Sequence, residues 1–154
     1  MKSILLSFFL ICLFGCATPV ANKNTVGQKF PIVKANYLSG ESVTLPNVGA
    51  IEREVERVII LVGYVQKSQF DVDRWTIGLT ETNVTLPIVE IAVINQWLPE
   101  VFAKKLDQSM RDGIPKNLWK SVITVYDEAQ KVRDFLGTTN PLNARAVVID
   151  SDGT

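Results

Sequence analysis

The residues that could do chemistry lie where a β-branched apolar run meets a helical pattern. The run is followed by Gln66, Lys67, Ser68, Gln69 and Asp71. Side chains at such a junction lie near a helix N-terminus, where the dipole and free backbone amides stabilise an anion such as a thiolate. The junction offers a hydroxyl and an amine but no cysteine.

A hydrolytic site at this junction lacks its usual parts. Serine is a weak nucleophile that needs a neighbouring base, and the chain contains no histidine. Lys67 acts as a base only when burial lowers its pKa strongly, and no third orienting group is evident. We therefore expect no catalytic residue, no cofactor and no metal ligand here, and we expect the Ser68 hydroxyl to cap the helix.

Overall charge excludes one class of partner. The 154 residues carry 16 Lys plus Arg and 16 Asp plus Glu. This balance provides no long-range field for polyanions, and no basic face interleaved with aromatic residues is present. We therefore expect no nucleic-acid partner.

The N-terminus reads as an export signal. Lys2 precedes an apolar run that is too short to span a bilayer, and the run ends "LFGCATP". This ending resembles the lipobox of bacterial lipoproteins, which implies a signal peptide over residues 1–15 and a diacylated Cys16 carrying palmitate. Two alternatives remain, namely an ordinary signal peptide cut near Ala17 and an uncleaved anchor helix.

The expected signal peptide and lipid anchor would account for both cysteines of the chain. The only cysteines are Cys12, within the expected signal peptide, and Cys16, so the mature domain would hold no free thiol. Residues 16–25 are small and polar, which predicts a flexible tether before a domain over 26–154. The resemblance places the chain in a bacterial cell envelope, and Ala17 after the lipidated cysteine favours the periplasmic face of the outer membrane.

Two continuous apolar runs predict the centre of the fold. They extend from Arg57 to Val65 and from Thr85 to Asn95, with a helical pattern between them. Apolar strands without alternation are typical of a parallel sheet covered on both faces, and strand, helix, strand is the order of a βαβ unit.

The remaining segments complete an α/β pattern. A hairpin turning at Gly40 is predicted before the βαβ unit, and a helix broken near Gly113 after it. Residues 122–131 read as a strand and an acidic turn, and 134–143 as a loop. A last strand ends in an Asp-Gly turn without a following strand, so we expect either a fragment lacking its final strand or an unpaired sheet edge.

This order resembles the thioredoxin-like superfamily in its peroxiredoxin and thiol-disulfide branch. The likeness is carried by "GQKFP" with "LSG" and "VTLP", by the central strand with its helix, and by "AVVIDSDG". Within that superfamily, "KSQFDVDRW" and "FLGTTN" are similar to mitochondrial ATP-synthase assembly factors of this fold. The resemblance implies a central mixed β-sheet flanked by helices, with hairpins at both ends.

The resemblance also locates what is missing. The redox nucleophile of the superfamily would fall near Ser68 and its resolving partner near Asp71, and neither residue is a cysteine. The cis-proline that the superfamily places beside this site would fall in "NAR", residues 143–145. We therefore interpret residues 66–69 and Asp71 as the position of a lost redox site.

Two further residues allow more than one interpretation. Glu90 lies inside an apolar run and is either a functional buried acid or a carboxylate paired with a base such as Arg145, which we favour. Trp97 precedes Pro99 in a predicted loop and is the best candidate for an aromatic residue facing a partner.

Together these features predict a non-catalytic, membrane-tethered envelope lipoprotein that acts by binding a protein, in assembly or scaffolding. The alternatives are a degenerate relative of the peroxiredoxins or thiol-disulfide oxidoreductases, and a small-ligand binding module using the mouth near residues 66–69.

Overall fold

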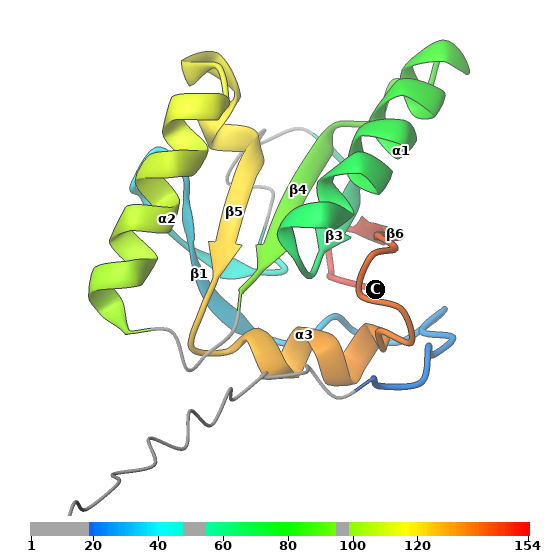
Figure 1. Ribbon diagram of the computed structural model, residues 1–154. Helices are drawn as coiled ribbons and strands as arrows, with labels where there is room; N and C mark the ends of the chain where they lie inside the picture. Colours follow the sequence, from blue (N-terminus) through cyan, green and yellow to red (C-terminus); the bar gives the residue numbers. More distant parts are fainter. Residues whose placement is uncertain (1–18, 48–54, 95–98) are drawn as a thin grey trace, which may run out of the picture.

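The structure, a computed structural model, describes residues 19–47, 55–94 and 99–154. Its centre is a six-stranded mixed sheet with strand order β2-β1-β5-β4-β3-β6 (Figure 1). The expected signal peptide, Cys16 and Trp97 lie outside the described residues. No helix within those three described ranges is both long and apolar enough to cross a membrane.

The first two strands form the predicted hairpin. β1 (Val33–Tyr37) pairs antiparallel with β2 (Ser42–Leu45), and both alternate exposed and buried residues. Gly40 has a φ of 102° in the connecting turn, a conformation that glycine adopts without steric cost. The predicted turn is therefore confirmed.

The central βαβ unit is also confirmed. β3 (Arg57–Gly63) runs parallel to β4 (Ile88–Val93), with α1 (Gln69–Glu81) between them. A single 3₁₀ turn over Gln66–Ser68 joins β3 to α1. Five consecutive residues of β3 are buried, as expected for a strand covered on both faces.

A second crossover extends the sheet. α2 (Glu100–Gly113) and a 3₁₀ segment (Lys116–Ser121) lead to β5 (Val122–Val125), which is parallel to β4. No residue of α2 is fully buried. It is held by polar contacts, since the Tyr126 hydroxyl donates to Asp107 at 2.6 Å and Arg111 Nε donates to the carbonyl of Leu38 at 2.8 Å.

One element differs from the prediction. Residues expected to form an acidic turn and a loop instead form α3 (Ala129–Leu136). The helix buries Ala129, Val132, Arg133 and Leu136, which are spaced as one helical face. The charged Arg133 interrupts the apolar pattern, and this is why the stripe is inconspicuous in the sequence.

The last strand lies at the edge of the sheet. β6 (Arg145–Asp150) pairs antiparallel with β3 and has no other strand neighbour among the described residues. The turn predicted after it is present, because the Gly153 N–H donates to the carbonyl of Asp150 at 3.0 Å.

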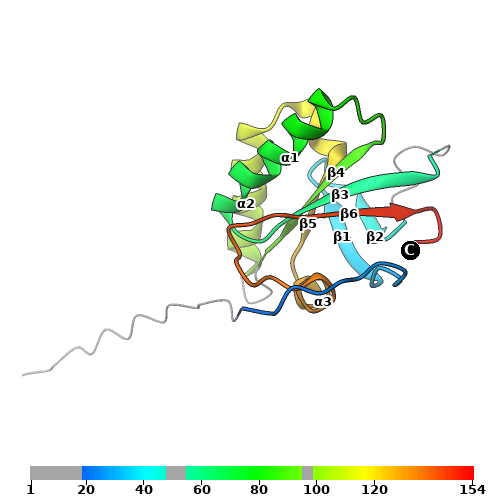
Figure 2. The same ribbon diagram turned by 90° about the vertical axis from the view of Figure 1, so that its right-hand side faces the viewer.

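The helices form a layer on each side of the sheet. α1 and α2 lie on one face, whereas α3 and the N-terminal segment lie on the other (Figure 2). The larger core is packed between the sheet and α3, and a smaller cluster around Leu61 and Val72 lies under α1.

The N-terminal segment packs against the domain. Val20 and Thr138 exchange backbone hydrogen bonds of 3.3 and 2.7 Å, and the Lys23 N–H donates to the carbonyl of Leu136. Gly137 has no side chain where this segment crosses, and a Cβ there would lie 2.1 Å from the carbonyl oxygen of Ala21. The described part of the expected flexible tether is therefore attached to the domain.

Candidate functional site

The hydroxyl of Ser68 is occupied by the backbone of the β3–α1 junction. It donates to the carbonyl of Val65 at 2.6 Å and accepts from the N–H groups of Tyr64 at 3.0 Å and Val65 at 3.3 Å. Ser68 is only 1% exposed. The expectation that it caps α1 is wrong, since the side chain makes no cap hydrogen bond and instead ties the turn to the end of β3.

Gly63 makes room for this arrangement. A Cβ built on Gly63 would lie 2.9 Å from Ser68 Oγ. The glycine therefore allows the last residue of β3 to approach the serine closely. A buried hydroxyl with its proton and both acceptor sites in use is poorly placed to attack a substrate.

The other junction residues point in different directions. Gln66, Lys67 and Gln69 are exposed, whereas Asp71 is partly buried. Asp71 Oδ2 accepts a hydrogen bond from the backbone N–H of Ala144 at 2.8 Å. The two positions where the resemblance places redox residues are thus brought to the same junction, and both serve as backbone ties.

Glu90 lies on the face of the sheet that α1 covers. Its carboxylate accepts a hydrogen bond of 3.4 Å from Gln69 Nε2, which also donates to Asp73. Burial raises the pKa of Glu90, and the nearby Asp73 charge acts in the same direction. The favoured pairing of Glu90 with Arg145 is not found, because Glu90 lies on β4 and Arg145 on β6, and β3 lies between these two strands.

A buried cation that the sequence did not single out lies under the ends of β3 and β4. Arg133 is 8% exposed, and its Nη2 donates to the carbonyls of Tyr64 at 3.3 Å and Val93 at 3.1 Å. Its guanidinium carbon lies 5.3 Å from the centre of the Tyr64 ring. Burial lowers the pKa of Arg133 and raises that of Tyr64 to about 12. The helical spacing of Ala129, Val132 and Leu136 is the sequence signal that would have placed Arg133 on a buried helix face.

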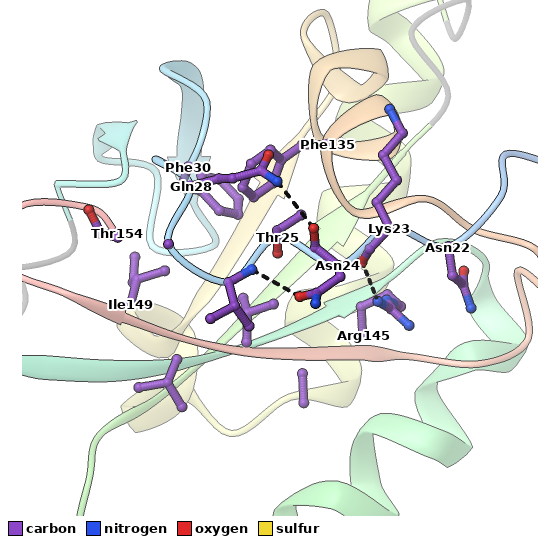
Figure 3. A pocket seen from close by; sticks show the side chains of 15 residues that line it. Asn22, Lys23, Asn24, Thr25, Gln28, Phe30, Phe135, Arg145, Ile149 and Thr154 are labelled. Carbon is purple, nitrogen blue, oxygen red and sulfur yellow. Dashed lines mark hydrogen bonds between the residues drawn. The ribbon is translucent and has the colours of Figure 1, made fainter.

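A cavity of about 650 Å³ lies beside β6 (Figure 3). One wall is formed by residues 22–28 and the other by residues 145–149, with Phe30 and Phe135 between them. Figure 3 shows Arg145 reaching Lys23, whose carbonyl accepts a hydrogen bond from Nη2 at 3.3 Å. No sequence signal indicated this cavity, because its walls are more than a hundred residues apart.

The sheet order, the flanking helices and the βαβ unit at the centre define a thioredoxin-like fold, as the sequence predicted. No cysteine lies at its β3–α1 junction. The chain belongs to the ATP10 protein family, which matches it over residues 60–154. The predicted likeness to ATP-synthase assembly factors of this fold is thereby confirmed at the level of the family.

Solved structures resemble the chain at low sequence identity. BsSco, a member of the Sco family of cytochrome c oxidase assembly proteins, has a TM-score of 0.49 at 9% identity over 86% of this chain and 83% of its own. A DsbF homologue from Corynebacterium diphtheriae has a TM-score of 0.45 at 10% identity, over 90% and 81% of the two chains. No curated protein matches the chain.

Proposed function

We propose that this protein is a lipid-anchored envelope protein whose thioredoxin-like domain acts without catalysis, by binding a protein during the assembly of a membrane complex. Membership of the ATP10 protein family supports an assembly role. The single observation that carries the non-catalytic part is the state of Ser68, which is buried with its hydroxyl hydrogen-bonded to Val65 and Tyr64.

The residues of the β3–α1 junction favour binding of a partner protein over catalysis. Thiol-disulfide exchange needs a thiolate, and within the described residues neither the junction nor any neighbouring position is a cysteine. Asp71 holds the backbone at Ala144, in the segment where the superfamily places its cis-proline, so this polar group is used internally. A partner would therefore be recognised by the domain surface.

The membrane tether is proposed from the sequence. Cys16 follows the lipobox-like "LFG", and lipidation there would anchor the domain through residues 17–19. A single acyl chain gives only weak membrane binding, whereas two or more chains give a stable anchor. Membrane attachment would confine the domain to the surface on which membrane subunits are assembled.

Crosslinking in intact membranes tests the proposal. The full chain with an affinity tag is crosslinked and purified, with the Cys16→Ser variant as the matched control because it retains the domain and loses the proposed acylation site. We expect a membrane-protein subunit to be enriched with the natural chain and reduced with the variant. Radiolabelled palmitate should be incorporated only into the natural chain.

Two activity assays complete the test. Reduction of insulin with dithiothreitol and turnover of peroxide should proceed at the rate of the buffer alone. A rate that exceeds this background would make the protein an enzyme and would overturn the proposal.

A further inference from the structure

The outer edge of β6 presents backbone groups without partners. The Asp150 N–H donates to the carbonyl of Thr154 at 3.1 Å and the Asp150 carbonyl accepts from Gly153, so both groups face away from β3. Backbone direction alternates along an antiparallel strand. Ala146 and Val148 therefore also turn their N–H and C=O groups away from β3, and none of the described residues hydrogen-bonds to them.

The cavity follows this edge. Its lining includes the consecutive residues 145–149, and consecutive residues can share one cavity only where it runs along the edge of a strand, because their side chains alternate between faces. We call the space between residues 22–28 and residues 145–149 the β6 slot. Val148, in the middle of this edge, is 54% exposed.

A contact between the two walls marks each end of the β6 slot. Arg145 bonds to the carbonyl of Lys23 at one end, and the Phe30 N–H donates to the carbonyl of Gly153 at 2.8 Å at the other. Between these ties the N-terminal segment and β6 run side by side in the same direction without pairing (Figure 3). Strand residues rise by about 3.3 Å each, so the slot accommodates about five extended residues.

The lining specifies the character of an occupant. Its charged side chains are those of Lys23 and Arg145, and none of the described residues that line the slot is acidic. The Lys23 side chain points away from Arg145 (Figure 3), so Arg145 is the cation that an occupant would meet. Arg145 Nε is buried without a hydrogen-bond partner among the described residues. Phe30, Val147 and Ile149 supply an apolar part of the wall, whereas residues 22–28 add the polar side chains of Asn24, Thr25 and Gln28. An extended apolar segment with a carboxylate at the Arg145 end meets both requirements.

We propose that the β6 slot binds an extended apolar segment of a partner protein by strand addition to β6, with a carboxylate of that segment held by Arg145. Main-chain hydrogen bonds to Ala146 and Val148 supply affinity, and the alternating apolar positions with the cationic end supply selectivity. This inference rests on the proposed function, because it assigns the surface and chemistry of partner binding.

A defined peptide tests the inference on the full chain, isotope-labelled and purified in detergent. The probe is acetyl-DVTVTV-amide, and its control is acetyl-KVTVTV-amide. We expect the probe to shift the amide resonances of Ala146 and Val148 and to slow their hydrogen exchange, and we expect the control to bind at least about tenfold more weakly. A peptide ending in a free C-terminal carboxylate, acetyl-TVTVTV, distinguishes a terminal carboxylate from a side-chain one.

A matched pair of variants tests the backbone contact. Val148→Pro removes an N–H that faces away from β3 and leaves the β3 pairing intact, whereas Val148→Thr keeps both the N–H and the β-branched shape. We expect the proline variant to lose at least about tenfold in affinity and the threonine variant to bind as the natural chain. If the proline variant fails to fold, a probe N-methylated at its central valine provides the same test.

Three outcomes would overturn the inference. The first is that the amide resonances of Ala146 and Val148 do not change at millimolar probe, and the second is that the probe and the lysine control bind with equal affinity. The third is that the protein forms a dimer that Val148→Pro dissociates, which would assign the edge to a second copy of this chain. Crosslinking in membranes separates this failure from failure of the proposed function. A partner captured equally by the Val148→Pro variant leaves that function standing and refutes the slot.

Discussion

Asp71 of α1 holds the backbone N–H of Ala144 at 2.8 Å. The bond joins the first turn of the helix after β3 to the residue before β6, across 73 positions of sequence. It lies where a thioredoxin-like enzyme would use a resolving residue and a cis-proline to handle a disulfide. In this chain the same place is a fixed structural contact, which is the basis of the first prediction.

Replacing Asp71 with Ala should destabilise the domain. The change leaves the partly buried N–H of Ala144 without its acceptor, which costs about 1–3 kcal/mol. Urea unfolding followed by circular dichroism measures the loss. Asp134→Ala is the matched control, since Asp134 is exposed and, among the described residues, accepts only from the Gln130 side chain. Equal effects of the two variants would show that the Ala144 contact contributes nothing.

Removing the Ser68 hydroxyl should also destabilise the fold. Ser68→Ala leaves the N–H groups of Tyr64 and Val65 without their acceptor, at a cost of about 2 kcal/mol. Thermal unfolding measures the effect. The control is Ser109→Ala. Among the described residues that exposed hydroxyl bonds only to the carbonyl of Lys105, one helical turn earlier, and its loss changes stability little. A Ser68→Ala variant as stable as the natural chain would contradict our account of the junction.

Gly63 and Ser68 should behave as a coupled pair. A Cβ at position 63 clashes with Ser68 Oγ at 2.9 Å, whereas its next neighbour, a methyl of Val72, lies at an ordinary 3.7 Å. Gly63→Ala should therefore destabilise the natural chain more than it destabilises the Ser68→Ala variant. A double-mutant cycle of unfolding free energies measures this coupling, which we expect to exceed about 0.5 kcal/mol. Additive effects would mean that the clash is relieved elsewhere.

The centre of the fold could be predicted because its strands and helix have clear local sequence patterns. The apolar run that becomes β3 is continuous, and Asp71 lies near the start of α1, where an acidic residue is favoured. α3 was missed because Arg133 occupies its buried face. This buried cation is held by the carbonyls of Tyr64, which follows β3, and Val93 of β4, and no local pattern reveals these contacts. Secondary structure thus followed from local pattern except where tertiary contacts override it.

The candidate sites were less predictable for the same reason. The sequence identified Ser68 and Asp71 as the residues at the junction, but their hydrogen-bond partners depend on a 3₁₀ turn and on a contact with Ala144. The β6 slot has no local signature at all. It exists because Lys23 and Arg145, 122 residues apart, meet at the edge of the sheet.

Gly137 should be indispensable for docking the N-terminal segment. Its φ is 74°, and a Cβ would lie 2.1 Å from the carbonyl oxygen of Ala21. Gly137→Ala should therefore displace residues 20–23, expose the β6 slot to protease at Lys23, and destabilise the domain by more than about 1 kcal/mol. Limited trypsin digestion and thermal unfolding measure both effects.

The control for Gly137 is Gly78→Ala. Gly78 lies in α1, with nothing within 4 Å of a Cβ. Alanine is the better helix former, so this variant should gain about 0.5–1 kcal/mol and keep the digestion pattern of the natural chain. Protection of Lys23 in the Gly137→Ala variant would show that the N-terminal segment does not need the glycine.

Glu90 should make the domain less stable as the pH rises. Burial, with the Asp73 charge beside it, raises the pKa of Glu90 above its unfolded value of 4.5, so the folded state binds this proton more tightly than the unfolded state does. Stability attributable to this group is therefore complete below the unfolded pKa and falls as the pH rises through the window between that value and the raised one. Gln69, the one neutral hydrogen-bond donor to the carboxylate among the described residues, offsets the effect only in part.

Glu90→Gln removes the titrating group and keeps the shape of the side chain. We expect its melting temperature to exceed that of the natural chain at pH 8 and the difference to shrink at pH 4, measured at equal ionic strength. Glu81→Gln is the control, since it makes the same change of charge at an exposed position at the end of α1. A Glu90→Gln variant whose advantage grows as the pH falls would reverse the sign and show that a cation, rather than burial, governs this carboxylate.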